Sequence, residues 1–327
     1  MEEYFNTKEK LTSNVIIDPV DLIQDTSRYE KYIEKTRDFN KFYISTGFKE
    51  LDKLIGGLDN EEDFAMVVAR TNFGKSWVLL KMAVASVLQG KKVGFYSGEM
   101  SEFKVGTRFD TLLGHINNNY ITHGNIEIQN EYKKYIDELP KKVNGGQFIP
   151  LTPQMINRFA TVDDLKVFIE KYQLDILFVD QIPLLGDKRN GRTLTEKFSN
   201  IAVDLKNLQV LKKIPIVCAH QQNRTKNEDG TIDTTQIAGS DDLGRFATLV
   251  LFIDRPKETE DLMKLIIGKV RDSGGVGKSL SYHIELNTGV FQYVPETEDD
   301  NLTIDTDDND IEKRYTDDIN TNGEDVL

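Results

Sequence analysis

The chain has a single cysteine, Cys218, among its 327 residues. An internal disulfide is therefore impossible, and a zinc site built on cysteines is excluded. The four histidines are not spaced as metal ligands either. Cys218 lies in the apolar run 216–219, so we expect it to be a small residue of the core.

Long hydrophobic runs are missing as well, because no stretch of 18 or more apolar residues occurs. A helix that crosses a membrane needs about 20 such residues, so we expect no membrane contact. The N-terminal run Met1-Glu2-Glu3-Tyr4 is acidic and lacks an apolar signal region, which favours a cytosolic protein. Hydrophobic residues make up 39% of the chain and charged residues 29%, as in an ordinary globular protein with a core.

Positive charge is scarce, since 41 basic residues face 54 acidic ones and the net charge is −13. A net negative charge argues against a nucleic-acid ligand if it is spread evenly over the chain. Here it is not spread evenly. Residues 295–327 contain thirteen acidic residues and only two basic ones, Lys313 and Arg314. The rest of the chain therefore has 41 acidic and 39 basic residues, a net charge of −2. We predict that 295–327 is an acidic, disordered tail and that the body can still bind DNA.

Residues 1–40 form a polar N-terminal segment with one predicted helix that begins at Asp18-Pro19, where Asp can cap the helix and Pro suits its first turn. Leu22, Tyr29 and Ile33 follow at helical spacing and form one narrow apolar stripe. Two interpretations of this stripe stay open. The helix packs on its own domain, or it is a linker helix that docks on a neighbouring subunit.

Residues 41–294 alternate between short apolar runs and helical segments. This pattern predicts one α/β domain whose mostly parallel sheet is covered by helices on both faces. The last strands have only turns between them and predict an antiparallel C-terminal extension. The predicted strands are 66–69, 92–96, 176–179, 215–218, 249–253, 265–267 and 280–286, and the predicted helices are 75–88, 103–115, 162–172 and 194–212.

The run Ala69-Arg70-Thr71-Asn72-Phe73-Gly74-Lys75-Ser76 follows a predicted strand and opens a predicted helix. This is the context of a phosphate-binding loop, in which backbone N–H groups and the helix N-terminus surround the phosphates of ATP. Lys75 would reach the β- and γ-phosphates and Ser76 would bind Mg²⁺. Ala69 stands where the motif usually has glycine. A second Gly-Lys-Ser, at 277–279, precedes a strand and is interpreted as a glycine-rich turn.

Two carboxylates follow predicted strands. Asp180 ends the strand 176–179, about a hundred residues after the phosphate loop, with one strand and two helices expected between them. It is placed to hold Mg²⁺ through water. Glu99 follows the strand 92–96 and could deprotonate the attacking water. The alternative for Glu99 is a residue that caps the next helix.

Taken together, these motifs resemble those of the DnaB-family replicative helicases over about residues 45–294. The resemblance includes Thr46-Gly47-Phe48-Lys49-Glu50-Leu51-Asp52 with Gly57-Leu58, the phosphate loop, and Ser97-Gly98-Glu99-Met100-Ser101. It also includes Asp180, His220-Gln221-Gln222-Asn223-Arg224 and Ile266-Ile267-Gly268-Lys269-Val270-Arg271.

The resemblance implies a RecA-like P-loop motor with a nucleotide site shared between subunits. In it Gln221 senses the γ-phosphate, while Lys269 and Arg271 reach the nucleotide of the neighbouring subunit. Two departures from the family pattern stand out. No counterpart of the family's helical N-terminal domain is found, which suggests a short phage- or plasmid-type form acting in a bacterial cytoplasm. Gln181 follows Asp180 where an aromatic residue is more usual.

The family's DNA-facing loops correspond here to two basic segments, 186–192 and 224–226. Their cations suit the phosphates of single-stranded DNA, although no aromatic stacking platform accompanies them. The alternative is that these are ordinary solvated surface loops. The candidate DNA-binding residues are Lys188, Arg189, Arg192, Arg224 and Lys226.

The sequence as a whole predicts an ATP-dependent DNA helicase that assembles as a ring, expected to be a hexamer, and translocates on single-stranded DNA. Primase, polymerase or a helicase loader are candidate partners, and the acidic tail either recruits them or keeps the protein soluble. Two rivals stay open, a RecA-like recombinase filament and an ATP-dependent loader or accessory scaffold. The Lys269-x-Arg271 pair and the Gly47-Phe48 segment favour the helicase.

Overall fold

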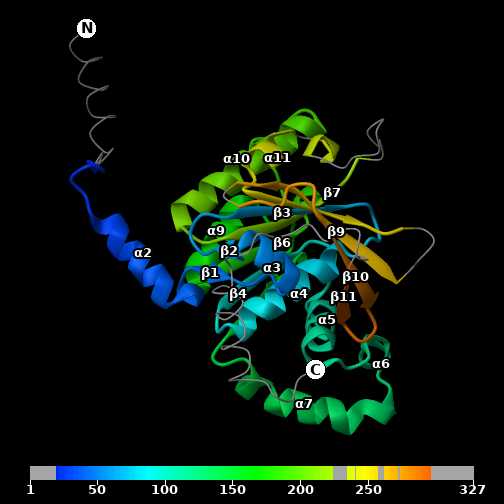
Figure 1. Ribbon diagram of the computed structural model, residues 1–327. Coiled ribbons are helices and arrows are strands. Elements are labelled where there is room, and N and C mark those ends of the chain that lie inside the picture. Colours follow the sequence, from blue (N-terminus) through cyan, green and yellow to red (C-terminus); the bar gives the residue numbers. More distant parts are fainter. Residues whose placement is uncertain (1–19, 224–233, 240, 257–260, 272, 296–327) are drawn as a thin grey trace. The chain divides into compact units, whose positions relative to one another are not determined.

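The computed structural model describes residues 20–223, 234–239, 241–256, 261–271 and 273–295 (Figure 1). The chain divides into two compact units, Met1–Phe39 and Asn40–Leu327. The predicted acidic tail lies outside the described residues, except for Pro295. None of the helices in the described part of the chain is long and apolar enough to cross a membrane.

The N-terminal unit contains the helix α2, Ser27–Arg37. The predicted start at Asp18-Pro19 lies outside the described residues, but Leu22 lies in a turn and not on the helix, so the predicted three-residue stripe is wrong. The physical reason is local. The side chains of Asp21 and Asp25 accept hydrogen bonds from the backbone N–H groups of Ile23 and Ser27, each at 2.9 Å, and such turns compete with a helix.

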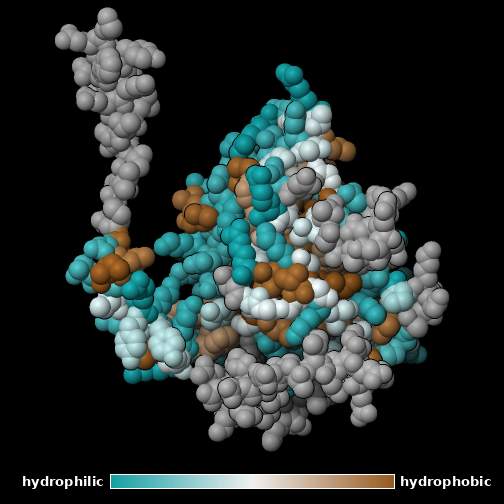
Figure 2. Space-filling view, turned by 45° about the horizontal axis from the view of Figure 1, so that its top comes forward, coloured by the Kyte–Doolittle hydropathy of each residue, from teal (hydrophilic) through white to brown (hydrophobic). Residues whose placement is uncertain are grey.

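This unit buries none of the residues of α2. Tyr29 is 68% exposed, and Val20 and Ile23 before the helix are 62% and 85% exposed. Figure 2 shows hydrophobic surface on this segment. A helix without a buried face does not stabilise itself by packing, because most helical stability in proteins comes from burial of an apolar face.

The second unit is built around a sheet that has nine strands among the described residues, in the order β11-β10-β9-β8-β3-β7-β6-β4-β5. Neighbouring strands from β8 to β5 are parallel, and β8 to β11 are antiparallel, as the sequence predicts. The bounds are β3 Phe64–Ala69, β4 Lys92–Ser97, β5 Gln147–Leu151, β6 Ile176–Asp180, β7 Ile216–Gln221, β8 Leu249–Asp254, β9 Leu262–Val270, β10 Ser279–Glu285 and β11 Val290–Val294.

Two further strands, β1 Tyr43–Ile44 and β2 Leu58–Asp59, form a small antiparallel sheet. The other elements are helices. They are α3 Lys49–Ile55, α4 Lys75–Leu88, α5 Glu102–Gly114, α6 Asn118–His123, α7 Gln129–Lys142, α8 Pro153–Ile156, α9 Val162–Tyr172, α10 Leu194–Lys212 and α11 Asp241–Phe246, with 3-10 turns η1 Phe39–Lys41, η2 Ile126–Ile128, η3 Ile182–Leu184 and η4 Thr234–Gln236.

The predicted helices 75–88, 103–115, 162–172 and 194–212 are confirmed as α4, α5, α9 and α10. The expectation of one strand and two helices between the phosphate loop and Asp180 is wrong, because β5 and the helices α6 to α8 also lie there. The α6–α7 region is rich in polar residues and is held both by apolar packing, with Ile121 and Tyr135 in the core, and by side-chain hydrogen bonds. Tyr132 and Tyr135 of α7 donate to the buried carboxylate of Asp110 on α5, at 2.6 and 3.1 Å.

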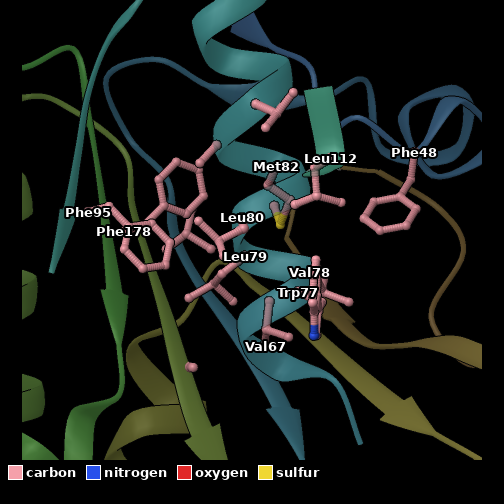
Figure 3. Packing of buried hydrophobic residues seen from close by; sticks show 14 of the residues in the cluster. Phe48, Val67, Trp77, Val78, Leu79, Leu80, Met82, Phe95, Leu112 and Phe178 are labelled. Atoms are coloured by element: carbon pink, nitrogen blue, oxygen red, sulfur yellow. The ribbon is translucent and has the colours of Figure 1, made fainter. Parts of the chain in front are cut away.

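Helices cover both faces of the sheet. One hydrophobic core lies between the sheet and α4 and α5, and another lies between the sheet and α9, α10 and α11. Figure 3 shows the first core, where Leu79 and Leu80 of α4 lie near Phe95 of β4 and Phe178 of β6. Burying a large apolar side chain contributes about 1.5–3 kcal/mol, so this layer contributes much of the stability.

The strands β3 and β6 are buried at every residue, which is the pattern of strands covered on both faces. Cys218 of β7 is fully buried, which confirms that it is a core residue. Residues 273–278 form bends and a turn before β10, and Ser279 is the first residue of that strand, so the second Gly-Lys-Ser precedes a strand and not a helix, as expected. The elements that position the site are therefore the buried parallel strands and α4.

Candidate nucleotide site

The strand register brings the predicted site residues to one edge of the sheet. Ala69 at the end of β3 pairs with Gln221 at the end of β7, and Ser97 at the end of β4 pairs with Asp180 at the end of β6. These strands are parallel, so their carboxyl ends lie side by side. In open α/β sheets, ligands bind outside this edge.

The phosphate loop connects β3 to α4. Its last residue, Gly74, has a φ of 96° and precedes the helix, and Asn72 has a φ of 66°. A Cβ atom at Gly74 would meet nothing within 4 Å, so glycine is favoured there by its backbone conformation. Ala69 is a paired strand residue between β7 and β8, which explains why the first position of the motif needs no glycine.

Lys75 is the first residue of α4. Its ammonium group donates hydrogen bonds to the carbonyl oxygens of Ala69 and Arg70, both at 3.1 Å. The side chain is thus folded back over the loop that it closes. Burial lowers the pKa of Lys75, and the negative charges of Asp180 and Glu99 oppose this effect. A partly buried cation in the first turn of a helix is suited to a polyanionic ligand.

Asp180 is 4% exposed, and burial raises the pKa of its carboxyl group to about 6. The hydroxyl of Ser76 and the cations Lys75 and Arg108 lower this pKa, whereas the charge of Glu99 raises it further. The Oδ2 atom of Asp180 is buried and accepts no hydrogen bond from the described residues. A buried oxygen without a donor, next to a serine hydroxyl, fits a site for a hard cation such as Mg²⁺.

The described residues contain no group of three or more His, Cys, Asp or Glu side chains that could together hold a metal ion. A cation bound by Ser76 and Asp180 would therefore take most of its oxygen ligands from phosphates and water. This is the usual arrangement for Mg²⁺ at nucleotide sites. The residues present thus fit a metal that arrives with a nucleotide.

Glu99 lies two residues beyond the end of β4 and is exposed. Its Oε1 atom accepts a hydrogen bond of 2.6 Å from Nε2 of Gln181, the residue that follows Asp180. The alternative interpretation of Glu99 as a helix cap is not supported. The N-cap of α5 is Ser101, whose hydroxyl accepts from the backbone N–H of Lys104 at 3.4 Å.

Gln221 is exposed at the end of β7, beside the phosphate loop. The backbone around it is tied to the loop, since the N–H of Gln222 donates to the carbonyl of Ala69 at 3.1 Å. The preceding residue, His220, is buried, and its Nε2 donates to the carbonyl of Ala238 at 2.6 Å. The Gln221 side chain therefore extends from a rigid strand end.

Two residues near this edge are not assigned a role by the sequence. Arg108 of α5 lies over the ring of Trp77, with its guanidinium carbon 5.0 Å from the ring centre. The positive charge of Arg108 lowers the pKa of Asp180. Burial lowers the pKa of Arg108 itself, and the negative charges of Asp180 and Glu99 oppose this effect. The other residue is Gln181. Its departure from the family pattern is visible in the sequence, but only the fold places its amide against Glu99.

Lys269 and Arg271 lie at the opposite end of the sheet. Lys269 of β9 pairs with Val250, near the start of β8, whereas Ala69 pairs with Ile253, near the end of β8. The ammonium of Lys269 donates to two carbonyls at the end of α11, at 2.8 and 3.0 Å. The structure therefore does not bring these residues to the phosphate loop of their own chain.

The basic segment 186–192 is organised by the carboxylate of Asp187. This carboxylate accepts from the backbone N–H groups of Arg189 and Gly191, at 2.9 and 2.6 Å. It also accepts from the side-chain amide of Asn200 on α10, at 3.1 Å. The segment is thus folded around an acidic side chain and attached to the next helix.

The cations of this segment lie at the surface. Lys188 forms an ion pair with Asp163, and Arg189 forms one with Asp204. Arg192 is exposed. The remaining DNA-binding candidates, Arg224 and Lys226, lie outside the described residues.

The order of the sheet, the loop before α4 and the strand-end carboxylates define the class of RecA-like P-loop domains. Residues 43–288 match the family described as the DnaB-like helicase C terminal domain. The chain belongs to this family, which implies that it binds a nucleotide.

Named relatives are bacterial helicases. The chain is 26% identical over 249 residues to a probable plasmid replicative DNA helicase of Chlamydia psittaci, covering 73% of this chain and 54% of the relative. It is 25% identical over 279 residues to the replicative DNA helicase DnaB of Haemophilus influenzae, covering 81% and 57%. The chain thus spans about half the length of these relatives.

Solved structures share the fold. One of them, described as an ATPase domain, has a TM-score of 0.69 at 20% identity and is covered completely, over 83% of this chain. A DnaB-like replicative helicase, described together with its interactions with primase, has a TM-score of 0.68 at 18% identity, over 90% of this chain and 72% of that one. The predicted fold class, a RecA-like α/β domain, is confirmed by these similarities.

Proposed function

We propose that this chain is the motor of an ATP-dependent DNA helicase that acts in replication. One observation carries the proposal: a phosphate loop with its lysine, a buried aspartate, an exposed glutamate and a glutamine meet at one edge of the sheet, in a chain of the DnaB-like family. The motor is assigned to residues 41–294, preceded by a linker segment, 1–40, and followed by an acidic tail, 295–327.

In this proposal ATP binds with its phosphates on the backbone of 69–74 and against the ammonium of Lys75. Ser76 and Asp180 would hold Mg²⁺, and the ion would supply positive charge against the phosphate oxygens. Glu99 accepts a proton from the attacking water, and its exposure leaves it accessible to that water. Gln221 senses the γ-phosphate from the end of β7.

The site is completed by a second copy of the chain. Leu249 pairs with Val270 and Ile253 lies beside Ala69, so about four residue steps, or about 13 Å, separate the two ends along β8. Arg271 therefore cannot serve its own phosphate loop without a change of fold. Lys269 and Arg271 instead act on the nucleotide of a neighbouring subunit, in a homo-oligomeric ring that we expect to be a hexamer.

The ring encloses single-stranded DNA, and the segments 186–192 and 224–226 face it. Hydrolysis moves these loops along one strand and excludes the other. Primase, polymerase or a loader are the candidate partners, and the bacterial sources of the relatives favour action in a bacterial cytoplasm.

A fork-unwinding assay with parallel measurement of ATP turnover tests this function. The wild-type chain should hydrolyse ATP and separate a forked duplex. Lys75→Ala should lose both activities because it removes the charge that holds the phosphates. Glu99→Gln should keep nucleotide affinity and lose turnover by about 10²–10⁴-fold, the usual contribution of a general base.

Near-normal turnover in Glu99→Gln would show that the base is another residue. Turnover without strand separation, together with helical filaments in electron micrographs on single-stranded DNA, would favour the recombinase over the helicase. Weak turnover that DNA does not change would favour the loader or scaffold.

A further inference from the structure

Gln181 follows the buried Asp180 at the end of β6 and is itself 6% exposed. Its amide nitrogen Nε2 donates a 2.6 Å hydrogen bond to Oε1 of Glu99. A carboxylate only accepts hydrogen bonds, so the NH₂ side of the amide must face it, whichever way the amide is assigned. The hydrogen bond between the two side chains thus connects the segments that follow the carboxyl ends of the neighbouring strands β4 and β6.

The backbones that carry these two side chains are bonded to each other. The N–H of Gly98 donates to the carbonyl of Asp180 at 2.7 Å, one residue away from each of the two side chains. A Cβ atom at Gly98 would lie 2.6 Å from the Cβ of Leu184, so η3 packs directly on this backbone. Glu99 and Gln181 are therefore presented to each other by a tightly packed frame.

The charged groups around Glu99 would otherwise compete for its carboxylate. Lys75 on α4 and Arg108 on α5 attract it, and the negative charge of Asp180 on β6 repels it. An exposed glutamate that two cations attract can turn towards either of them. A neutral amide holds one carboxylate oxygen in place without cancelling its charge.

The acceptor end of Gln181 gives a second indication. Its Oε1 atom is buried and accepts no hydrogen bond from the described part of the chain. A buried acceptor without a partner is unfavourable, and an apolar side chain of equal size would avoid the cost. The amide is thus placed for its contact with Glu99 and not for the stability of the fold.

We propose that Gln181 is a positioning residue that orients Glu99 for ATP hydrolysis, an inference that rests on the proposed function. With Oε1 held by Gln181, the Oε2 atom of Glu99 accepts a proton from the attacking water. The water oxygen forms its bond to the γ-phosphorus while the bond from that phosphorus to the bridging oxygen breaks, and ADP leaves with the electron pair. Phosphate and ADP are the products.

The test compares the full-length wild-type chain with Gln181→Met, which keeps the side-chain volume and removes the donor. The kcat for ATP should fall about 10–100-fold, since a misplaced base loses part of its contribution. The KM and the affinity for a fluorescent ATP analogue should change less than about two-fold, because the phosphates contact other residues. The melting temperature should not fall.

Gln209→Met is the matched control. Gln209 is also a buried glutamine, 1% exposed, and its Nε2 donates at 2.6 Å to the carbonyl of Glu61, away from the nucleotide site. Its replacement removes this hydrogen bond and also the 2.6 Å bond that its Oε1 accepts from Lys206, and it should leave kcat at the wild-type level. A loss of kcat in this variant equal to that of Gln181→Met would overturn the assignment, because any buried amide would then have the same effect.

A double-mutant cycle separates positioning from a structural role. In the Glu99→Gln background, Gln181→Met should change the residual turnover by less than about two-fold, because there is no base left to orient. A further 10–100-fold loss in that background would show that Gln181 does not act through Glu99. Gln181→Met with wild-type kcat, or with nucleotide affinity lost in parallel with kcat, would equally overturn the inference.

The proposed function fails under a different set of results. A wild-type chain without ATP turnover, or one in which Glu99→Gln is fully active, refutes the proposed function and this inference together. A wild-type chain that depends on Glu99 while Gln181→Met stays active refutes only the role of Gln181.

Discussion

His220 is a single buried side chain next to the site that makes the free energy of unfolding depend strongly on pH. Burial lowers its pKa to about 4, the hydrogen bond to the carbonyl of Ala238 opposes this shift, and the charge of Lys75 adds to it. That carbonyl can only accept, so Nε2 carries the proton of the neutral ring. The ring packs edge-to-face on Phe198, with centres 5.2 Å apart.

The first prediction concerns this histidine. Its pKa is about 4 in the folded chain against 6.5 as its ordinary value. A lowered pKa gives stability that is present above pH 6.5 and is lost as the pH falls towards 4. The shift corresponds to about 3 kcal/mol of the free energy of unfolding. His220→Gln keeps a donor for the carbonyl of Ala238 but does not titrate. Urea unfolding of both proteins is measured at a series of pH values, from neutral down to the folded-state pKa of His220. Over this range the free energy of unfolding of the wild type should fall relative to that of the variant.

The difference between the two proteins is the relevant quantity. Burial raises the pKa of Asp52 and of Asp180 to about 6, and these groups favour the folded state as the pH falls through 6. Both groups are common to wild type and variant, so their effect cancels in the subtraction. A difference that stays constant over this pH range would contradict the prediction.

Among the elements, the segment 186–192 between η3 and α10 is more ordered than its composition indicates. Its cations are paired with carboxylates on α9 and α10, Lys188 with Asp163 and Arg189 with Asp204. Exposed ion pairs of this kind contribute at most about 1 kcal/mol. A DNA phosphate can therefore replace either carboxylate, but it must compete with it.

The second prediction follows from this competition. Replacing Lys188, Arg189 and Arg192 together by Gln should weaken binding of single-stranded DNA for all sequences. The slope of log affinity against log salt should decrease by about 0.7 for each DNA phosphate that the variant no longer binds. Fluorescence anisotropy at several salt concentrations measures both quantities.

The matched variant changes the carboxylates instead. Replacing Asp163 and Asp204 by Asn leaves Lys188 and Arg189 without these carboxylates and should strengthen DNA binding. An unchanged salt slope in the basic-residue variant, or no gain in the carboxylate variant, would show that this segment does not bind DNA phosphates.

In the molecule as a whole, the parts of the proposed active site lie at two ends of one sheet. The phosphate loop lies at the end of β8, and Arg271 lies just beyond Val270, which pairs with the start of β8. Burial lowers the pKa of Lys269, and the nearby charge of the exposed Arg271 lowers it further. A surface on which these two cations lie close together suits a nucleotide held by another subunit.

The third prediction uses mixed assemblies. Arg271→Ala should bind nucleotide through its own Lys75 but lose turnover by about 10³–10⁵-fold, the range for arginine fingers in other P-loop enzymes. Lys75→Ala has an intact Arg271 but no functional phosphate loop. The two inactive variants are mixed and allowed to exchange subunits. ATP turnover should be restored at interfaces where the intact phosphate loop of one subunit faces the intact Arg271 of the next.

Mass measurement of differently tagged subunits shows whether mixing has occurred. Recovery should depend on the ratio of the two variants and should be absent before exchange. Activity of Arg271→Ala alone, or no recovery in verified mixed assemblies, would show that Arg271 does not act on the nucleotide of a neighbouring subunit.

Local patterns in the amino-acid sequence are enough to predict most elements and their order. The apolar run of β3 and the limits of α4, α9 and α10 follow from residue spacing, because strands and helices repeat every 2 and 3.6 residues. The same patterns place Lys75, Asp180 and Glu99 after strands of a parallel sheet, whose carboxyl ends must meet. They do not predict the edge strand β5 or the polar helix α7, because neither has a long apolar run.

Which side chains from distant segments face each other depends on tertiary packing alone. Gln181 and Glu99 are 82 residues apart and meet because β6 pairs with β4 in one register. Lys269 caps α11 and lies far from the phosphate loop because β9 runs antiparallel to β8. Periodicity along the chain carries no information on register between strands, and register together with core packing is what orients these side chains.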